Sequence, residues 1–323
     1  MRQLPLVWSP SDSERLRIVK PNGIANKVMP EDRAFHDWYR FVLSFPPHLV
    51  QDYIKDFGLA DRHTILDPFC GTGTTLIEAK LAGIRAVGLE ANPFAQFASS
   101  VKINWDIDYH LLHSAAREIA EEVAQVFASQ GIDDDLPCDS RVERLALRTL
   151  SAETQTLLVK DSISPLPLHK SLVLLERIQA LHDQDFYDHL LLAFANALVF
   201  AVSNLHFGPE VGVKRNGIKK DVPVLAPWLS AIDTMTEDLE RVADKKYPRA
   251  AVHLADARNI SSVIAPRSVD AIITSPPLSK REGLLPDHKA RIGHAGFRRG
   301  STGSADSEEA VAALKHARRL QGR

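Results

Sequence analysis

Two separate parts of the chain show the pattern of a parallel sheet. Residues 64–67 and 85–90 are short apolar runs typical of buried strands, and residues 74–82 between them have the apolar spacing of a helix that Gly83 ends. A strand, a helix and a second strand in this order form one unit of a parallel sheet. Apolar runs return at 251–254 and 269–273, so we expect two more strands there.

The stretch between these parts has mainly helical periodicity. Apolar residues recur three or four positions apart, which predicts helices over 115–127, 142–158, 172–181 and 186–202. A loop, followed by a helix that begins near Pro47, is expected before the first strand. The pattern as a whole predicts an α/β fold with a long helical insertion.

Composition narrows the class of protein without identifying a partner. The chain of 323 residues is 45% hydrophobic and 25% charged, which is normal for a globular protein, and its formal net charge of −2 neither favours nor opposes a polyanionic partner. Two cysteines, Cys70 and Cys138, cannot build a disulfide framework or a zinc site, which favours a cytoplasmic location. The longest apolar stretch, 190–202, is shorter than a membrane span, so no membrane partner is expected.

A glycine-rich turn after the first strand is the main candidate for chemistry. Asp67 ends the strand, and Gly71 and Gly73 let the backbone turn closely into the following helix. Glu90 ends the next strand, where an acidic residue can bind both hydroxyls of a ribose. An open sheet binds adenosine-containing cofactors in this manner. A glycine turn alone is also compatible with the absence of any ligand.

Longer motifs around this turn carry a family resemblance. Asp67-Pro68-Phe69-Cys70-Gly71-Thr72-Gly73-Thr74-Thr75, Glu78-Ala79 and Gly88-Leu89-Glu90-Ala91-Asn92-Pro93 resemble the first two motifs of the N4-cytosine and N6-adenine DNA methyltransferases. Residues 43–50, which include Phe45, resemble the segment that this family folds over the methionine end of its cofactor. Asp256 resembles the third acidic position, which contacts the adenine amine.

The resemblance implies S-adenosylmethionine as cofactor and a Rossmann-like class I methyltransferase sheet. The cofactor-binding residues that it implies are Phe45, Asp67, Pro68, Phe69, Gly71, Gly73, Thr74, Glu90, Asn92 and Asp256. It also divides the chain into five parts, namely an irregular arm (1–35), the cofactor-binding half of the domain (36–104), a mainly helical insertion with a possible role in substrate recognition (105–250), the remaining core strands with the catalytic loop (251–278) and an aberrant or disordered tail (279–323).

Ser275-Pro276-Pro277 resembles the first three residues of the family's catalytic motif and directly follows an apolar strand. An exocyclic amine is a poor nucleophile because its lone pair is delocalised into the ring. Accepting hydrogen bonds from both of its N–H groups localises that pair, and the Ser275 side chain and the Pro276 carbonyl are the expected acceptors, held by consecutive prolines of fixed φ. The base must first leave the helix stack, so duplex DNA with a flipped base is the expected partner.

Three functions remain open at this point. The first is methylation of an exocyclic amine in DNA, and serine at position 275 resembles the N4-cytosine enzymes more than the N6-adenine ones. Related RNA methyltransferases that act on a guanine amine share the first motif but carry asparagine at the catalytic position. A remnant that binds cofactor, or nothing, without catalysing transfer is the third possibility. The sequence shows no restriction endonuclease partner, although the family allows one.

The chain departs from the family pattern after Pro277. The family has an aromatic residue next and further strands that complete a seven-stranded sheet, whereas this chain has Leu278 and only 45 residues beyond it, mostly poor strand formers. Divergence is one interpretation. Another is that residues from about Leu278 onward are an out-of-frame tail on a truncated protein lacking its last strands, because a one-nucleotide shift with permitted codons restores a tyrosine and a family-like continuation.

Two other segments carry interpretations of their own. Residues 203–210, with the basic residues that follow, are either a substrate-facing loop whose cations meet phosphates or a solvated turn; the cations are Lys214, Arg215, Lys219 and Lys220. Packing beneath the cofactor loop is expected for His36, Trp38 and Tyr39. Cys70 is expected to be a small apolar filler rather than a nucleophile.

Overall fold

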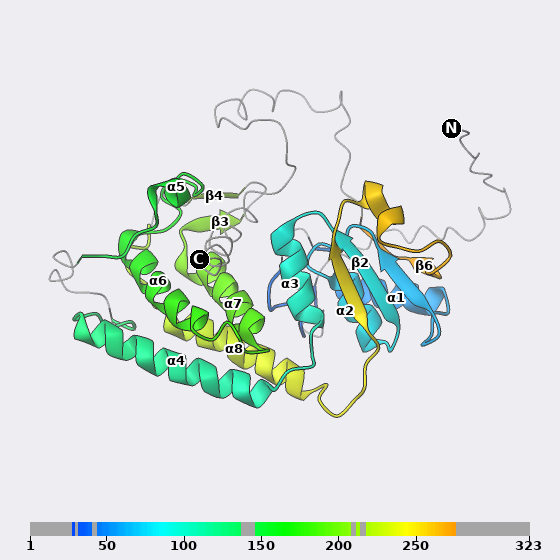
Figure 1. The fold of residues 1–323 in the computed structure, drawn as a ribbon, viewed down its shortest axis with the longest axis horizontal. Helices are drawn as coiled ribbons and strands as arrows, with labels where there is room; N and C mark the ends of the chain where they lie inside the picture. Colours follow the sequence, from blue (N-terminus) through cyan, green and yellow to red (C-terminus); the bar gives the residue numbers. More distant parts are fainter. Residues whose placement is uncertain are drawn as a thin grey trace, which may run out of the picture.

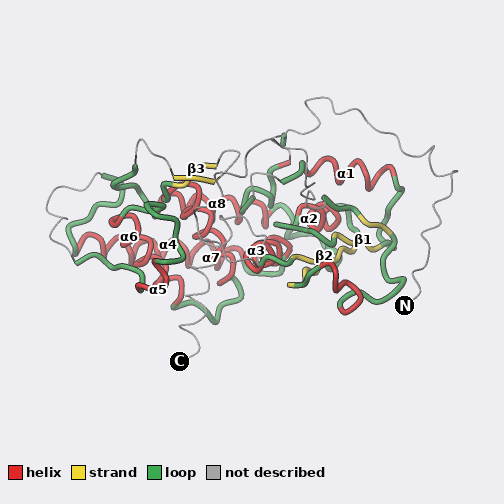
Figure 2. Tube along the Cα trace, turned by 90° about the horizontal axis from the view of Figure 1, so that it is seen from above, coloured by secondary structure: helices red, strands yellow, loops and turns green. Residues whose placement is uncertain are grey.

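Two groups of secondary structure lie side by side in the molecule (Figures 1 and 2). The computed structural model describes residues 28–29, 32–40, 44–136, 146–207, 211–213 and 218–275. One group is a parallel sheet with helices packed on it, and the other is made mainly of helices. In the described part of the chain, no helix is long and apolar enough to cross a membrane.

The sheet has four parallel strands among the described residues. They are β1 (Thr64–Asp67), β2 (Arg85–Glu90), β5 (Ala250–Leu254) and β6 (Ala271–Ile272), in the order β5-β2-β1-β6. Asp67 pairs with Gly88, and Glu90 pairs with Leu254, so the strands end at a common edge. The predicted α/β, Rossmann-like fold is confirmed. The predicted loss of the last strands concerns residues 276–323, which lie outside the described residues.

Helices cover the sheet because each strand–helix–strand connection returns over it. They are α1 (Pro47–Asp56), α2 (Thr74–Leu81) and α3 (Pro93–Ile103), and the predicted helix starting near Pro47 is confirmed. Seven of the eight residues of α2 are buried, since the helix is enclosed by the strands, α1 and α3. After β5, the 3₁₀ helix η5 (Ala257–Ser262) leads toward β6.

The second group contains the helices of the predicted insertion. They are α4 (Tyr109–Ser129), α5 (Ala152–Gln155), α6 (Pro165–Gln179), α7 (Tyr187–Asn196), its π-helical continuation η4 (Ala197–Val202) and α8 (Leu225–Glu240). Their apolar faces meet in one core around Trp228, which is fully buried and donates its indole N–H to the Leu190 carbonyl at 3.3 Å. Helices were predicted over 115–127, 172–181 and 186–202, and the structure confirms all three.

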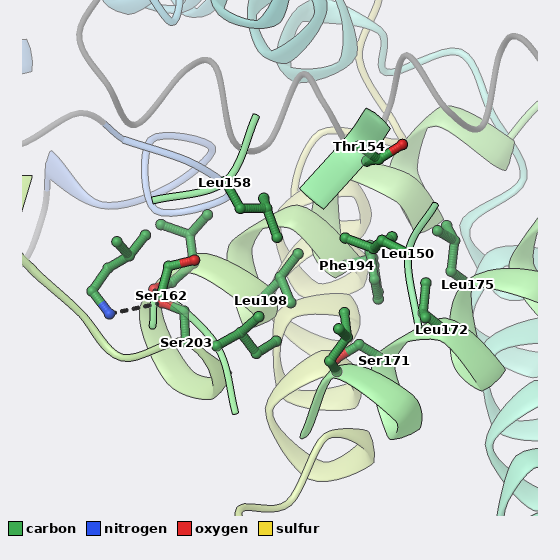
Figure 3. Close-up of a pocket in the computed structure, with 14 residues that line it drawn as sticks. Leu150, Thr154, Leu158, Ser162, Ser171, Leu172, Leu175, Phe194, Leu198 and Ser203 are labelled. Carbon is green, nitrogen blue, oxygen red and sulfur yellow. Dashed lines mark hydrogen bonds between the residues drawn. The ribbon is translucent and has the colours of Figure 1, made fainter. Parts of the chain in front are cut away.

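The prediction of one helix over 142–158 is wrong for its described part. Only α5 is helical there, while residues 146–150 have no regular structure and 137–145 lie outside the described residues. The Arg148 backbone N–H donates to His169 Nδ1 at 2.9 Å instead of joining a helical ladder. Leu150 faces an apolar cavity of about 70 Å³ together with Phe194 and Leu198 (Figure 3). The apolar residues of this segment therefore pack against the neighbouring helices although the segment itself is not helical.

The segment after η4 also differs from the prediction. Residues 203–210 were expected to be a loop, but Leu205–Phe207 forms β3, which pairs antiparallel with β4 (Val211–Val213). Lys219 Nζ donates to the carbonyls of Ala201 and Ser203, at the end of the π-helix. Of the basic run, Lys219 is thus held by the protein itself, while Lys214 and Arg215 lie outside the described residues.

Buried hydrogen bonds join the helical group to the sheet group. The Asp238 Oδ2 atom of α8 accepts from the Phe35 backbone N–H at 2.8 Å and from the Trp38 indole N–H at 2.9 Å. His36 lies 2.7 Å from Glu78 of α2, and His36, Trp38 and Tyr39 are all at most 3% exposed. The burial of these three side chains agrees with the packing role expected of them.

Candidate active site

Four residues singled out in the sequence lie along one edge of the sheet. Asp67 ends β1 and Glu90 ends β2, while Asp256 and Ser275 follow β5 and β6 by two and three residues. Because all four strands are parallel, the strand order places Asp256, Glu90, Asp67 and Ser275 in that sequence along the carboxyl edge. The chain passes from β1 to β2 to β5 in one direction and then returns to the other side of β1. Open sheets bind ligands at such a reversal, which lies here between Asp67 and Ser275.

The loop after β1 requires glycine at two positions. Gly71 has a φ of +52° and Gly73 a φ of +91°, values that favour glycine. A Cβ atom on Gly73 would lie 2.5 Å from Ser99 Oγ of α3, so the backbone passes very close to this helix. The Gly73 N–H donates to the Cys70 carbonyl at 2.8 Å, which closes the turn, and α2 begins at the next residue.

Asp67 is a buried carboxylate with one free acceptor. It is fully buried, its Oδ1 accepts from the Phe69 backbone N–H at 3.1 Å, and its Oδ2 is buried without a hydrogen-bond partner among the described residues. Burial raises the pKa of Asp67. The Phe69 N–H and the nearby Thr75 and Thr274 hydroxyls, which lie outside hydrogen-bond geometry with this carboxylate, offset part of this rise. A buried polar atom without a partner is costly, so a ligand that donates a hydrogen bond would relieve the cost.

Glu90 and Asn92 hold the neighbouring loop. The Glu90 carboxylate accepts from the Gly71 N–H at 2.9 Å and from the Asn92 N–H at 2.7 Å, and thus ties the ends of β1 and β2 together. Asn92 caps α3, because its side-chain oxygen accepts from the backbone N–H groups of Phe94 and Ala95. Each Glu90 oxygen keeps a second lone pair that can accept a hydrogen bond from a ribose hydroxyl. Binding of a ribose at Glu90 stays a prediction.

Asp256 is engaged with a neighbouring cation. Its carboxylate forms a bidentate ion pair with Arg258, with the closest approach 2.6 Å, and also accepts from the Arg258 backbone N–H. These hydrogen bonds lower the pKa of Asp256 to about 2. The pair is exposed to solvent, so a ligand can reach the carboxylate, although a contact with adenine would have to share it with Arg258.

The remaining residues of the predicted cofactor set surround the loop. Phe45 and Pro68 are half-buried, Phe69 is 40% exposed at the surface of the turn, and Thr74 is buried in the first turn of α2. Cys70 is 3% exposed, and burial together with the charges of Asp67 and Glu90 raises the pKa of its thiol well above the ordinary value. A thiol in this state is a packing group, which agrees with the interpretation drawn from its sequence.

Only the first residue of the catalytic triplet can be located. Ser275 is exposed, two residues after the buried Ile273, while Pro276 and Pro277 lie outside the described residues. The Ile273 backbone N–H donates to the Leu66 carbonyl at 3.1 Å, which holds the start of this loop beside β1. Leu278 and the proposed frame shift also fall outside the described residues.

The sequence analysis gave no role to three hydroxyl groups at this site, although Thr75 belongs to the quoted motif. Ser99 Oγ and Thr274 Oγ1 are buried without a hydrogen-bond partner among the described residues, and Thr75 Oγ1 lies 3.4 Å from the Ile273 carbonyl. Ser99 lies on α3, 26 positions after Gly73, and no local pattern marks it. Thr274 directly precedes the predicted catalytic triplet, and this adjacency was the one available signal.

Comparison with known proteins gives matches to methyltransferases. A family model described as DNA methylase matches residues 8–99. The chain is 28% identical over 283 residues to the Type II methyltransferase M.BsoBI of Geobacillus stearothermophilus, a match that covers 82% of this chain and 53% of that protein. It is 38% identical over 72 residues to the Type II methyltransferase M.AvaI of Nostoc, covering 22% of this chain and 14% of that protein.

A shorter match links the chain to an RNA enzyme. The tRNA (guanine(10)-N2)-dimethyltransferase of Methanothermobacter thermautotrophicus is 40% identical over 78 residues, which cover 24% of this chain and 22% of that protein. No solved structure matches the chain.

The lengths limit what these matches say about activity. The chain spans about half the length of M.BsoBI and smaller shares of the other two relatives. The match over residues 8–99 includes the cofactor loop, and the M.BsoBI match extends over most of the chain. On these findings, the chain is similar to DNA methylases over residues 8–99 and to a Type II methyltransferase over most of its length.

Proposed function

We propose that this chain transfers a methyl group from S-adenosylmethionine to an exocyclic amine of a DNA base, with cytosine N4 favoured over adenine N6. The observation that carries the proposal is the alignment of Asp256, Glu90, Asp67 and Ser275 along the carboxyl edge of one parallel sheet. This is the edge at which open sheets bind ligands.

The residues of the cofactor loop fit S-adenosylmethionine. Asp67 Oδ2, which has no hydrogen-bond partner among the described residues, is an acceptor for the methionine amino group, and open space lies beside Gly71 in the same loop. Phe69 offers an exposed apolar face, and Phe45, Pro68, Thr74, Glu90, Asn92 and Asp256 complete the proposed set. When bound, the cofactor supplies a methyl group on a positively charged sulfur.

The position of Ser275 supports a role in orienting the target amine. Its hydroxyl is exposed at the carboxyl end of β6, on the other side of β1 from Glu90. We propose that this oxygen accepts a hydrogen bond from the target amine and that the Pro276 carbonyl, with Pro277 behind it, accepts the other. The proton released on methylation leaves from the same amine. Serine at this position favours cytosine N4.

The substrate proposed is duplex DNA with one base flipped out of the helix. Unstacking and unpairing one base cost a few kcal/mol, which contacts with the protein must offset. The helical group flanks the sheet and is proposed to contribute such contacts (Figure 1). A restriction endonuclease that cuts the same site is a further proposed partner, which the names of the Type II relatives support.

A second candidate function is methylation of a guanine amine in RNA. The match to the tRNA (guanine(10)-N2)-dimethyltransferase supports it, although that match covers only 78 residues. Serine rather than asparagine at 275 argues against it. A third candidate is a remnant that binds cofactor without transfer, for which the departure from the family pattern at Leu278 is the support.

A methyl-transfer assay separates these candidates. The full chain is incubated with tritiated S-adenosylmethionine and either duplex DNA or tRNA, and the methylated nucleoside is identified by mass spectrometry. We expect N4-methylcytosine in DNA. N6-methyladenine would correct the target base, label in tRNA alone would support the second candidate, and saturable cofactor binding without transfer would support the remnant.

A serine substitution tests the role of the catalytic residue. Ser275→Ala is expected to lower the transfer rate by about 100-fold while leaving the calorimetric affinity for S-adenosylmethionine unchanged, because the hydroxyl acts on the amine. The control is Ser268→Ala, an exposed serine that precedes β6. Equal rates in the two variants would contradict the assignment of Ser275.

A further inference from the structure

A cleft of about 760 Å³ lies at the edge of the sheet opposite to the candidate active site. It is bounded by the last turns of α2 and α3, the connection that leads to α4, and the connection from α8 into β5. Both connections lie at the lower side of the sheet in Figure 1, where the strands begin. A volume of this size is within the range of small-molecule sites.

The lining of the cleft is strongly cationic. Four basic side chains line it, Lys80, Lys245, Lys246 and Arg249, against the single carboxylate of Asp106. With the described residues, Lys245, Lys246 and Arg249 form no ion pair and no side-chain hydrogen bond, and all three are exposed, so their charges face the solvent of the cleft. Three cations without protein partners around one concave surface are suited to a multiply charged anion.

Lys80 forms a fixed positive charge at the inner wall. It is 9% exposed, its Nζ donates to the Ile103 carbonyl at 2.6 Å, and the same atom lies 4.1 Å from the ring centroid of Trp105. Phe35 stacks on Trp105 at 4.5 Å and Tyr247 packs edge-on at 4.8 Å. The wall is therefore held in place before any ligand binds. Burial lowers the pKa of Lys80 to about 8, and a bound anion would favour its charged form.

We propose that this cleft binds a diffusible polyphosphate, namely pyrophosphate or the phosphate chain of a nucleoside triphosphate. Phosphate oxygens pair with several lysine and arginine side chains at once, whereas a carboxylate ligand would use only part of the cationic set. The site is separate from the cofactor edge, so anion binding does not depend on the proposed function; only the preference for a diffusible ligand over DNA rests on it.

The position of the cleft favours a diffusible ligand over the DNA backbone. The five residues of β5 separate the two edges by roughly 15 Å, at about 3.3 Å per residue. A straight duplex whose target base reaches Ser275 runs along the carboxyl edge and does not extend to the opposite one. The cleft also adjoins both connections between the sheet and the helical group, so a ligand there contacts the segments that join them.

Titration of the full chain with pyrophosphate and with ATP tests the proposal. Binding is measured by calorimetry and by tryptophan fluorescence, and sodium chloride is adjusted to keep the ionic strength constant. Saturable binding of one or both is expected. The Lys245→Ala/Lys246→Ala double variant is expected to bind at least about tenfold more weakly, because two charge-assisted contacts are lost. The Lys55→Ala/Lys160→Ala variant, which removes two exposed charges elsewhere, is expected to bind like the unaltered chain.

The controls make each outcome decisive. Circular dichroism and urea unfolding check that both double variants are folded, without relying on any ligand. Equal weakening in the two variants, or the absence of saturable pyrophosphate and ATP binding, would overturn the proposal. A Lys245→Ala/Lys246→Ala variant that loses affinity for duplex DNA alone would also overturn it and would assign these lysines to the DNA backbone.

Discussion

The cofactor loop and the helical group differ in how far their buried polar side chains are paired. At the loop, Asp67 Oδ2, Ser99 Oγ and Thr274 Oγ1 are buried without hydrogen-bond partners among the described residues. In the helical group, the fully buried Lys170 ammonium lies 2.7 Å from an Asp221 oxygen and 3.3 Å from an Asp134 oxygen. A folded protein leaves few buried polar groups unpaired, so three such atoms at one loop favour an external partner there. Of the described residues of the helical group, His189 alone has such an atom, its Nδ1.

The paired polar groups of the helical group stabilise the helical group itself. The Asp134 carboxylate that contacts Lys170 also accepts from the backbone N–H groups of Val224 and Leu225, at the start of α8. Asn204 donates to the Asp161 carbonyl and the Ser164 hydroxyl and accepts from the Lys219 N–H. Such networks fix loops and helix ends against one another. They leave little capacity for a ligand.

The largest expected effect comes from breaking the paired network. Lys170→Met leaves the Asp134 and Asp221 carboxylates without their buried cation, and we expect the free energy of unfolding to fall by about 3–5 kcal/mol. Urea unfolding of both proteins measures this. Lys160→Met, at an exposed lysine, is the control and should have little effect. A loss below about 1 kcal/mol would show that the network is not essential to the fold.

A substitution at the unpaired group should act in the opposite direction. Asp67→Asn removes a buried charge and is expected to raise the free energy of unfolding of the cofactor-free protein by about 1 kcal/mol. It should weaken binding of S-adenosylmethionine at least about tenfold, because the acceptor for the amino group is altered. Unfolding and calorimetric titration measure the two effects, and a loss of stability with unchanged affinity would make Asp67 a purely structural residue.

The pH dependence gives this test a second readout. Burial raises the pKa of Asp67 in the folded protein above the ordinary value of 3.8, so the folded state holds this proton more strongly than the unfolded state. The stability that protonated Asp67 contributes is present below pH 3.8 and is lost as the pH rises through the folded-state pKa. The stabilisation by Asp67→Asn should therefore be larger at pH 7 than at pH 4.

The smallest effects come from a matched pair of serines. Ser203 Oγ donates to the Val199 carbonyl at 2.7 Å and accepts from the Leu205 N–H at 3.3 Å, so Ser203→Ala should lower the free energy of unfolding by about 1 kcal/mol. Ser99→Ala removes an unpaired hydroxyl and should change it by less than about 0.5 kcal/mol. Chemical unfolding of both variants tests the pair, and equal losses would remove the contrast between the two regions.

The sheet and its loop were largely predictable because their signals are local. Residues 64–67 and 85–90 are apolar runs in the sequence and become β1 and β2 with the same bounds. The strand expected over 269–273 is shorter, since only Ala271 and Ile272 pair with β1. Glycine at 71 and 73 is diagnostic because the left-handed backbone is nearly closed to other residues.

The helical group was predicted less well because its signals are not local. Periodicity identified three of its helices, but Leu147 and Leu150 have helical spacing in the sequence and no helix in the structure. The β3–β4 pair depends on a hydrogen-bond partner in another segment, which no single-segment pattern reveals. Lys219 belongs to a basic run that suggests phosphate contacts, yet it donates to the carbonyls that end the π-helix.

The sequence alone determined the cofactor motif and the two strands beside it, because these follow from residue identities at short spacing. Only the tertiary structure decided which acceptors remain free. Glu90 and Asn92 make backbone hydrogen bonds and Asp256 pairs with Arg258, whereas Asp67 keeps an unpaired oxygen. Whether a polar atom is satisfied depends on groups that the fold brings together from distant positions, and this is the property that distinguishes a ligand-binding atom from a structural one.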